Sequence, residues 1–196
     1  MQDLEKLAVN RGTTIKELME NAGKQVCSVV KEKYDLTDKH VVIFAGHGNN
    51  GGDGFVAARH LAEECQVIVL FFGWEEKLSD EAKENYEKLK ESSINVFPIE
   101  SKEDLENFHF QEGIELILID SILGTGVEGK IREPLSLGID FFNSVKGEKV
   151  AIDVPSGMNA DTGEVEDKVC DVDLIISLHD IKKGLEKFKD KVVVVD

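Results

Sequence analysis

The stretch AGHGNNGGDGFVAARHL, from Ala45 to Leu61, decides how the rest of this sequence is interpreted. It follows the apolar run Val41 to Ala45 and leads into an amphipathic pattern that predicts a helix from Asp53 to Glu64. Five of its first ten residues are glycine. Because glycine lets backbone N–H groups approach a ligand closely, the stretch predicts a flexible loop between a strand and a helix.

Apolar runs and amphipathic segments alternate along the remaining chain. This alternation predicts an α/β fold, a three-layer sandwich with helices on both faces of a doubly wound, mostly parallel sheet. We expect one domain over residues 1–196, because no repeat, low-complexity tract or linker interrupts the sequence. The predicted strands are Val41–Ala45, Val67–Phe72, Val96–Ile99, Leu116–Asp120, Val150–Val154, Leu174–Leu178 and Val192–Val195. The predicted helices are Ile15–Val30, Asp53–Glu64, Ser79–Glu91, Lys102–Phe108 and Pro134–Ser144.

The composition argues against several kinds of partner. Asp and Glu outnumber Lys and Arg by 39 to 23, and the net charge of −16 opposes binding to nucleic acids or anionic membranes. We find no apolar run long enough for a membrane span and no signal-peptide pattern. The three widely spaced cysteines predict neither a disulfide framework nor a metal knuckle. We therefore expect a cytoplasmic protein.

Three segments that follow predicted strands contain both glycine and a carboxylate. They run from Gly46 to Gly54, from Asp120 to Lys130 and from Asp153 to Gly163. In an open parallel sheet, ligands bind beyond the carboxyl ends of the strands, and right-handed crossovers bring these ends to one edge. We therefore expect the three segments to form one site.

The first segment contains the pattern G-x-G-x-x-G, which alone is a weak indication of dinucleotide binding. The acidic partner expected about 20 residues later is missing, and the absence of a Lys-Ser or Lys-Thr pair excludes a Walker A loop. The segment therefore predicts a phosphate or nucleotide site of another kind. The alternative is a tight turn with Asp53 as a helix-terminal acid. His47 is either a catalytic base or an ordinary turn residue.

Taken together, the motifs resemble those of the NAD(P)H-hydrate epimerase family, also called the YjeF N-terminal domain. The resemblance rests on GNNGGDG with ARHL, on a strand-end aspartate followed by GTG and REP, and on DVPSG with ADTG. LMENAG, from Leu18 to Gly23, and KKGL, from Lys182 to Leu185, are similar to further family motifs, with Lys183 in place of the usual proline. The resemblance covers nearly the whole chain and implies a Rossmann-like sandwich.

The resemblance implies an isomerase that interconverts the R and S forms of hydrated NADH or NADPH, so that a separate dehydratase can restore the cofactor. It also implies a homodimer and a potassium ion in the site. Because 196 residues are too few to include the dehydratase domain fused to some relatives, we expect a stand-alone epimerase or one piece of a longer protein.

The resemblance also carries site residues over, motif by motif. The segment Gly124 to Lys130 would bind the phosphates, and Asp153 would lie near the reacting ring. The residues that would contact the substrate are Asn49, Asn50, Gly51, Gly52, Asp53, Gly124, Thr125, Gly126, Val127, Glu128, Gly129, Lys130 and Asp153. The residues that would hold potassium are Asn50, Asp120 and Ser156.

The implied reaction needs a group that acts as an acid and then as a base. The substrate hydroxyl lies on a carbon bonded to the ring nitrogen, so protonation lets it leave as water, and water then returns to the other face of a planar iminium. A buried carboxyl suits this task because burial raises its pKa. Asp153 is the first candidate and Asp53 the second, and ring opening at the same carbon is an alternative route.

Two other functions compete with the epimerase. One is a non-catalytic scaffold of the same fold that binds a nucleotide or a protein. The other is an ordinary nicotinamide dehydrogenase, which the missing acidic residue opposes.

Overall fold

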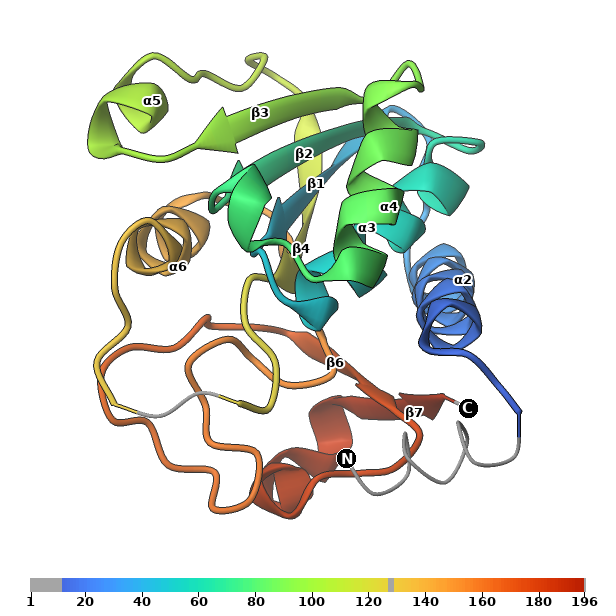
Figure 1. Cartoon of the computed structure of the whole chain (residues 1–196), viewed down its shortest axis with the longest axis vertical. Helices are drawn as coiled ribbons and strands as arrows, with labels where there is room; N and C mark the ends of the chain where they lie inside the picture. Colours follow the sequence, from blue (N-terminus) through green and yellow to red (C-terminus); the bar gives the residue numbers. More distant parts are fainter. Residues whose placement is uncertain (1–11, 127–128, 196) are drawn as a thin grey trace.

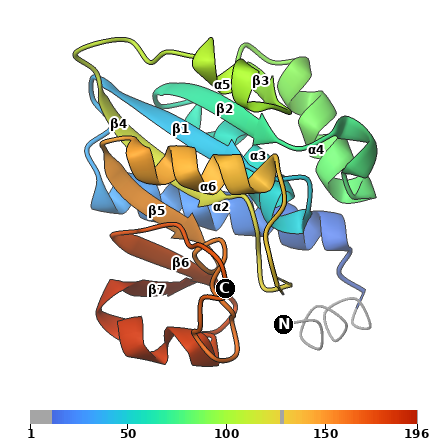
Figure 2. The same ribbon diagram turned by 90° about the vertical axis from the view of Figure 1, so that its left-hand side faces the viewer.

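A seven-stranded sheet forms the centre of the protein, and helices cover both of its faces (Figure 1, Figure 2). The computed structural model describes residues 12–126 and 129–195. Within these ranges, no helix has the length and apolar character needed to cross a bilayer. The helices are α2 (Ile15–Lys33), α3 (Asn49–Leu61), α4 (Asp80–Lys90), α5 (Lys102–Glu106) and α6 (Leu135–Ser144), with the 3-10 helices η1 (Glu75–Lys77) and η2 (Lys183–Lys191). The strands are β1 (Lys39–Ala45), β2 (Gln66–Phe72), β3 (Asn95–Ile99), β4 (Glu115–Ser121), β5 (Glu148–Ile152), β6 (Leu174–Leu178) and β7 (Val192–Val195).

The strands lie in the order β3-β2-β1-β4-β5-β6-β7, and all neighbours are parallel. The chain first builds outward from β1 to β3, then crosses back to build the other half from β4 to β7. The winding direction therefore reverses between β1 and β4, which is the place where doubly wound sheets bind ligands. The predicted α/β fold with a doubly wound parallel sheet is confirmed.

Successive residues of β1 enter two separate hydrophobic cores. Val41, Ile43 and Ala45 pack with α2, α3 and α4, whereas Val42 and Phe44 pack with α6 on the other face (Figure 2). Side chains of a strand alternate between its two faces, so a strand covered on both faces must be apolar throughout. This requirement explains the continuous apolar runs in the sequence.

The glycine segment, residues 46–54, is more ordered than its composition predicts. Helix α3 begins at Asn49, so the prediction of a flexible loop that lasts until Asp53 is wrong. A Cβ atom on Gly51 would lie only 1.9 Å from the carbonyl oxygen of Gly46. The glycines are needed because the first turn of the helix lies directly against the end of β1, where no side chain fits.

Strand β5 ends at Ile152, earlier than the predicted end at Val154. The next residue, Asp153, has a φ of 68°, in the left-handed region that non-glycine residues rarely adopt. Its amide N–H donates to the Ile176 carbonyl oxygen over 2.7 Å, which ties this turn to β6. The backbone therefore leaves the sheet at the residue that the sequence singles out for catalysis.

Replacing Gly51 with alanine tests the close approach of α3 to β1. Helix propensity alone predicts that alanine inside α3 stabilises the protein by up to about 1 kcal/mol. The 1.9 Å approach to the Gly46 oxygen predicts the opposite, because overpacking costs about 1–3 kcal/mol. We expect chemical denaturation to show a net loss of about 2 kcal/mol in the free energy of unfolding. Gly126→Ala is the control, because a Cβ there meets no atom within 4 Å. An alanine variant at Gly51 as stable as the wild type would contradict the steric explanation.

Candidate active site

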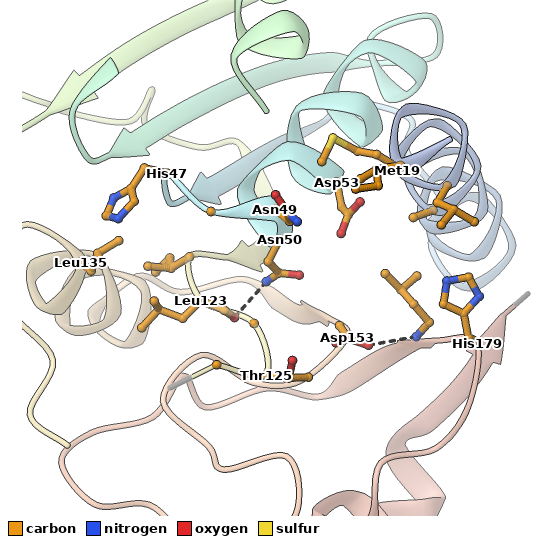
Figure 3. Close-up of a pocket in the computed structure, with 18 residues that line it drawn as sticks. Met19, His47, Asn49, Asn50, Asp53, Leu123, Thr125, Leu135, Asp153 and His179 are labelled. Atoms are coloured by element: carbon orange, nitrogen blue, oxygen red, sulfur yellow. Dashed lines mark hydrogen bonds between the residues drawn. The ribbon is translucent and has the colours of Figure 1, made fainter. Parts of the chain in front are cut away.

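A pocket of about 370 Å³ opens at the carboxyl ends of β1, β4, β5 and β6 (Figure 3). The three segments that the sequence predicts at one edge all contribute to its lining, together with the start of α2 and the end of β6. The polar lining side chains are His47, Asn49, Asn50, Asp53, Thr125, Asp153 and His179. The apolar ones are Ile15, Leu18, Met19, Ala22, Ile122, Leu123, Leu135 and Leu178.

Asp153 brings a buried carboxylate to the wall of this pocket. Its side chain is 4% exposed and forms an ion pair with Lys182, whose side chain is 9% exposed. The Leu178 amide N–H also donates to the carboxylate over 3.3 Å (Figure 3). Burial raises the pKa of Asp153, and the ammonium group of Lys182 opposes this rise. The partners of this carboxylate come from β6 and from the turn after it.

Asp53 reaches the same pocket from α3, on a different wall from Asp153 (Figure 3). Asn49, from the first turn of this helix, lines the pocket beside it, whereas Gly51 and Gly52 are buried in that turn and do not. The pocket therefore has two carboxylates on separate walls, and each of them has a chemistry suited to proton exchange with a ligand.

A second buried carboxylate, Asp120, lies at the end of β4, outside the pocket lining. It accepts hydrogen bonds from Ser156 N (2.7 Å), Ser156 Oγ (2.5 Å) and Ile122 N (3.1 Å). Burial raises its pKa to about 6. In the described part of the chain, no basic side chain forms an ion pair with Asp120. Its negative charge is therefore stabilised by neutral hydrogen-bond donors alone.

Asn50 joins Asp120 and Ser156 in one oxygen-rich cluster. Its Nδ2 donates to the Leu123 carbonyl oxygen over 2.9 Å, and that oxygen lies 3.1 Å from Ser156 Oγ. The structure thus brings together the three residues predicted to hold potassium, and it adds a backbone carbonyl. No group of three or more His, Cys, Asp or Glu side chains in residues 12–126 and 129–195 has an arrangement that fits a metal ion.

Among its described residues, the segment after β4 lines the pocket with its first part. Gly124 and Thr125 line the pocket together with Gly126, whereas Gly129 and Lys130 do not. The amide N–H of Gly129 donates to Glu166 Oε2 over 2.8 Å, so a carboxylate already occupies this predicted phosphate donor. Two further predicted substrate contacts, Val127 and Glu128, lie outside the described residues.

A family model described as YjeF-related protein N-terminus matches residues 15–184. This chain belongs to that family. The match runs from the first residue of α2 to the turn after β6, so it includes every element that lines the pocket. The resemblance drawn from the sequence motifs is therefore confirmed.

Relatives that are named for an enzymatic activity resemble this chain over most of its length. An NAD(P)H-hydrate epimerase of Nitrosopumilus maritimus is 37% identical and aligns with 97% of this chain and 87% of its own. A bifunctional NAD(P)H-hydrate repair enzyme, Nnr, of Methanopyrus kandleri is 39% identical over 88% of this chain. This chain spans 35% of the bifunctional protein. The crystal structure of the yeast protein ynu0, YNL200c, superposes with a TM-score of 0.79 at 27% identity and covers 93% of this chain and 79% of the yeast chain.

Sequence reasoning missed the roles of two residues that contribute to the site. Lys182 belongs to the KKGL motif, but nothing in its neighbours indicates that it pairs with Asp153. His179 lines the pocket in a left-handed conformation with a φ of 66°, which no pattern in the sequence indicates. His47, for which the sequence leaves two roles open, lines the pocket too, and burial lowers its pKa, which favours the neutral ring near pH 7.

Helix α2 forms the apolar wall, and a charged network fixes its position. Glu20 of α2 accepts hydrogen bonds from Arg59 Nη2 (2.5 Å) and from His60 Nε2 (2.8 Å), both on α3. Burial opposes the ionised form of Glu20, but these two partners together lower its pKa to about 2. The network therefore ties the wall that carries Met19 to the helix that carries Asp53.

Removing the charge of Glu20 tests this network. Because the pKa of Glu20 is lowered from 4.5 to about 2 in the folded protein, its contribution is present above pH 4.5 and is lost as the pH falls towards 2. We expect Glu20→Gln to reduce the free energy of unfolding by about 1–2 kcal/mol at pH 7 and by roughly half as much or less at pH 3. Chemical denaturation at both pH values provides the measurement, with the exposed Glu32→Gln on the same helix as control. The network has no stabilising role if both variants unfold alike at pH 7.

Proposed function

We propose that this chain interconverts the R and S forms of hydrated NADH and NADPH. The observation that carries the proposal is a buried carboxylate, Asp153, in the wall of a pocket at the switch point of the sheet. The relatives named NAD(P)H-hydrate epimerase support it, because they align with nearly the whole chain.

The chemistry that we propose follows from the structure of the substrate. Protonation of the hydroxyl on the carbon beside the ring nitrogen lets water leave, and the nitrogen lone pair forms a planar iminium. Water then adds to the opposite face and loses a proton to a carboxylate. Asp153 is the first candidate for this exchange, because burial favours the neutral form that donates the proton. Asp53 is the second candidate, and the carboxylates of both residues stabilise the cationic intermediate.

The apolar wall of the pocket gives the ring a place to bind. Met19 of α2 lies on one side of the pocket and Leu123 on another (Figure 3), and Leu18 and Ile122 also line it. Apolar contacts of this kind bind a flat ring through its faces and keep bulk water away from the reacting carbon. Gly124, Thr125 and Gly126 line the pocket after β4, and the dinucleotide portion would bind along them.

A potassium ion fits the cluster of Asn50, Asp120 and Ser156, and we propose that they hold it. Hard monovalent cations prefer oxygen ligands, and the cluster offers carboxylate, hydroxyl, amide and backbone carbonyl oxygens. The buried charge of Asp120 has no basic partner among the described residues, so a cation would compensate it. A bound ion would supply positive charge that stabilises the three segments around the pocket.

We further propose that a dehydratase specific for one epimer acts with this chain. Relatives named bifunctional NAD(P)H-hydrate repair enzymes support this partner, because they carry a second activity in one protein. A homodimer, a cytoplasmic location and a single domain over residues 1–196 stay predictions.

Replacing Asp153 with asparagine tests the catalytic assignment. Asparagine tolerates the left-handed φ of 68° at this position, and it accepts the Leu178 hydrogen bond. It does not transfer protons, so we expect epimerisation to slow by at least about a hundredfold. One pure epimer of hydrated NADH is incubated with the protein, and the epimer ratio is followed by chromatography against an enzyme-free sample.

The controls separate loss of chemistry from loss of folding. The variant leaves Lys182 without its carboxylate, so its thermal midpoint is measured and the assay is run well below it. The exposed Asp161→Asn controls for the substitution itself. If Asp153→Asn keeps full activity and Asp53→Asn loses it, Asp53 is the residue that transfers the proton. A wild-type chain that leaves the epimer ratio at the enzyme-free rate would favour a non-catalytic scaffold instead.

Cation dependence of stability tests the potassium site. A ligand that binds only the folded state stabilises it by about 2.7 kcal/mol at a hundredfold excess over Kd. We expect the thermal midpoint to rise more in potassium chloride than in lithium or sodium chloride of equal ionic strength. Asp120→Asn abolishes this difference, whereas the exposed Asp171→Asn preserves it. Equal midpoints in all three salts, or a potassium effect that survives in Asp120→Asn, would refute the site.

A further inference from the structure

Lys182 lies behind the catalytic carboxylate rather than in the pocket. Its ammonium group pairs with Asp153 and donates to the carbonyl oxygens of Leu178 (2.6 Å) and Asp180 (3.2 Å). The hydroxyl of Ser177 lies 3.4 Å away from the same nitrogen. An ammonium group has three N–H donors, and protein oxygens occupy all of them. Lys182 therefore has no donor left for a substrate phosphate.

The backbone is shaped to bring this pair together. Asp153 and His179 follow the neighbouring strands β5 and β6, and both adopt left-handed conformations with φ of 68° and 66°. Non-glycine residues in this region cost free energy and persist only where the surrounding structure requires them. The His179 amide N–H donates to the Val195 carbonyl oxygen over 2.7 Å, which holds the turn that directs Lys182 back towards β5.

Three titratable side chains among the described residues bear on the charge of Asp153. Lys182 and His179 face it from the turn after β6, and Asp53 lies on another wall of the pocket. Burial favours the neutral carboxyl, whereas Lys182 favours the carboxylate. A group that must both donate and accept one proton works best when neither its protonated nor its ionised form dominates. At Asp153, burial and Lys182 act on this balance in opposite directions.

We propose that Lys182 is a positioning residue for the reaction, which holds the Asp153 side chain at the pocket wall and keeps both its charged and its neutral form available. This proposal rests on the proposed function. In the step concerned, the Asp153 carboxyl gives its proton to the leaving hydroxyl and, as a carboxylate, takes one from the water that adds. Without Lys182, the neutral form persists to higher pH, and the carboxylate that forms when the proton leaves loses the positive charge that stabilises it.

The pH dependence of epimerisation distinguishes this role from simple support of the fold. We expect Lys182→Met to move the basic limb of the kcat/KM profile, where Asp153 loses the proton that it donates, upward by at least about one pH unit. Lys182→Gln keeps some hydrogen bonds but not the charge, so it shifts this limb of the profile in the same way. It replaces Lys182→Met in the test if that variant does not fold. Lys182→Arg keeps the charge and holds the limb near its wild-type position. The neighbouring, exposed Lys183→Met is the matched control and leaves the profile unchanged.

A second measurement does not depend on activity. Carbon-13 NMR of protein labelled at the aspartate carboxyl groups follows the titration of Asp153, whose signal is assigned by its loss in Asp153→Asn. The midpoint moves upward in Lys182→Met and Lys182→Gln, but not in Lys183→Met. A wild-type chain without epimerase activity overturns the proposed function, while a shifted midpoint still establishes that Lys182 controls Asp153. A midpoint that stays in place, or activity reduced by one factor at every pH, overturns the role of Lys182.

Discussion

The site depends first on how closely helix α3 approaches the ends of β1 and β4. A Cβ on Gly46 would lie 2.0 Å from the Ile122 carbonyl oxygen, and one on Gly54 would lie 2.1 Å from Ser121 Oγ. Only glycine permits these distances, so the helix starts at the very edge of the sheet. Its first turn then places Asn50 beside the oxygen-rich cluster and Asp53 beside the pocket. A wider helix-to-sheet distance would separate α3 from the segments that follow β4 and β5.

The two buried carboxylates, Asp120 and Asp153, have different partners, and this difference fits their proposed roles. Asp153 has a lysine beside it, so both of its protonation states are accessible close to the pocket. The partners of Asp120 are neutral donors, namely Ser156, the Ile122 amide and the Cys170 thiol, which leaves a negative site for a cation. An acidic chain with a net charge of −16 thus keeps its functional charges in local environments that differ from its surface.

The sequence predicts the fold well because the fold depends on repeated, local signals. Seven apolar runs and the amphipathic segments between them indicate the strands and helices, and the structure confirms this architecture. The segments that form the site are also predictable, because strand ends in a parallel sheet share one edge. Individual contacts are not predictable in this way. The ion pair of Asp153 with Lys182 depends on two residues in the left-handed conformation. The hydrogen bond from the Gly129 N–H to Glu166 depends on where the long connection between β5 and β6 runs. Such contacts join residues far apart in the chain, and no local pattern records them.

The pocket also has a consequence for how this protein folds. Its lining extends from Ile15 to His179, and neighbouring walls come from opposite ends of the sequence. Parallel sheets with many contacts of this kind fold slowly, because distant segments must meet before their contacts compensate for the lost chain entropy. A chain with its helices formed and half of its sheet assembled would already bury much apolar surface, yet it would have no pocket. In this protein, the pocket is therefore complete only when segments from both ends of the sequence have come together.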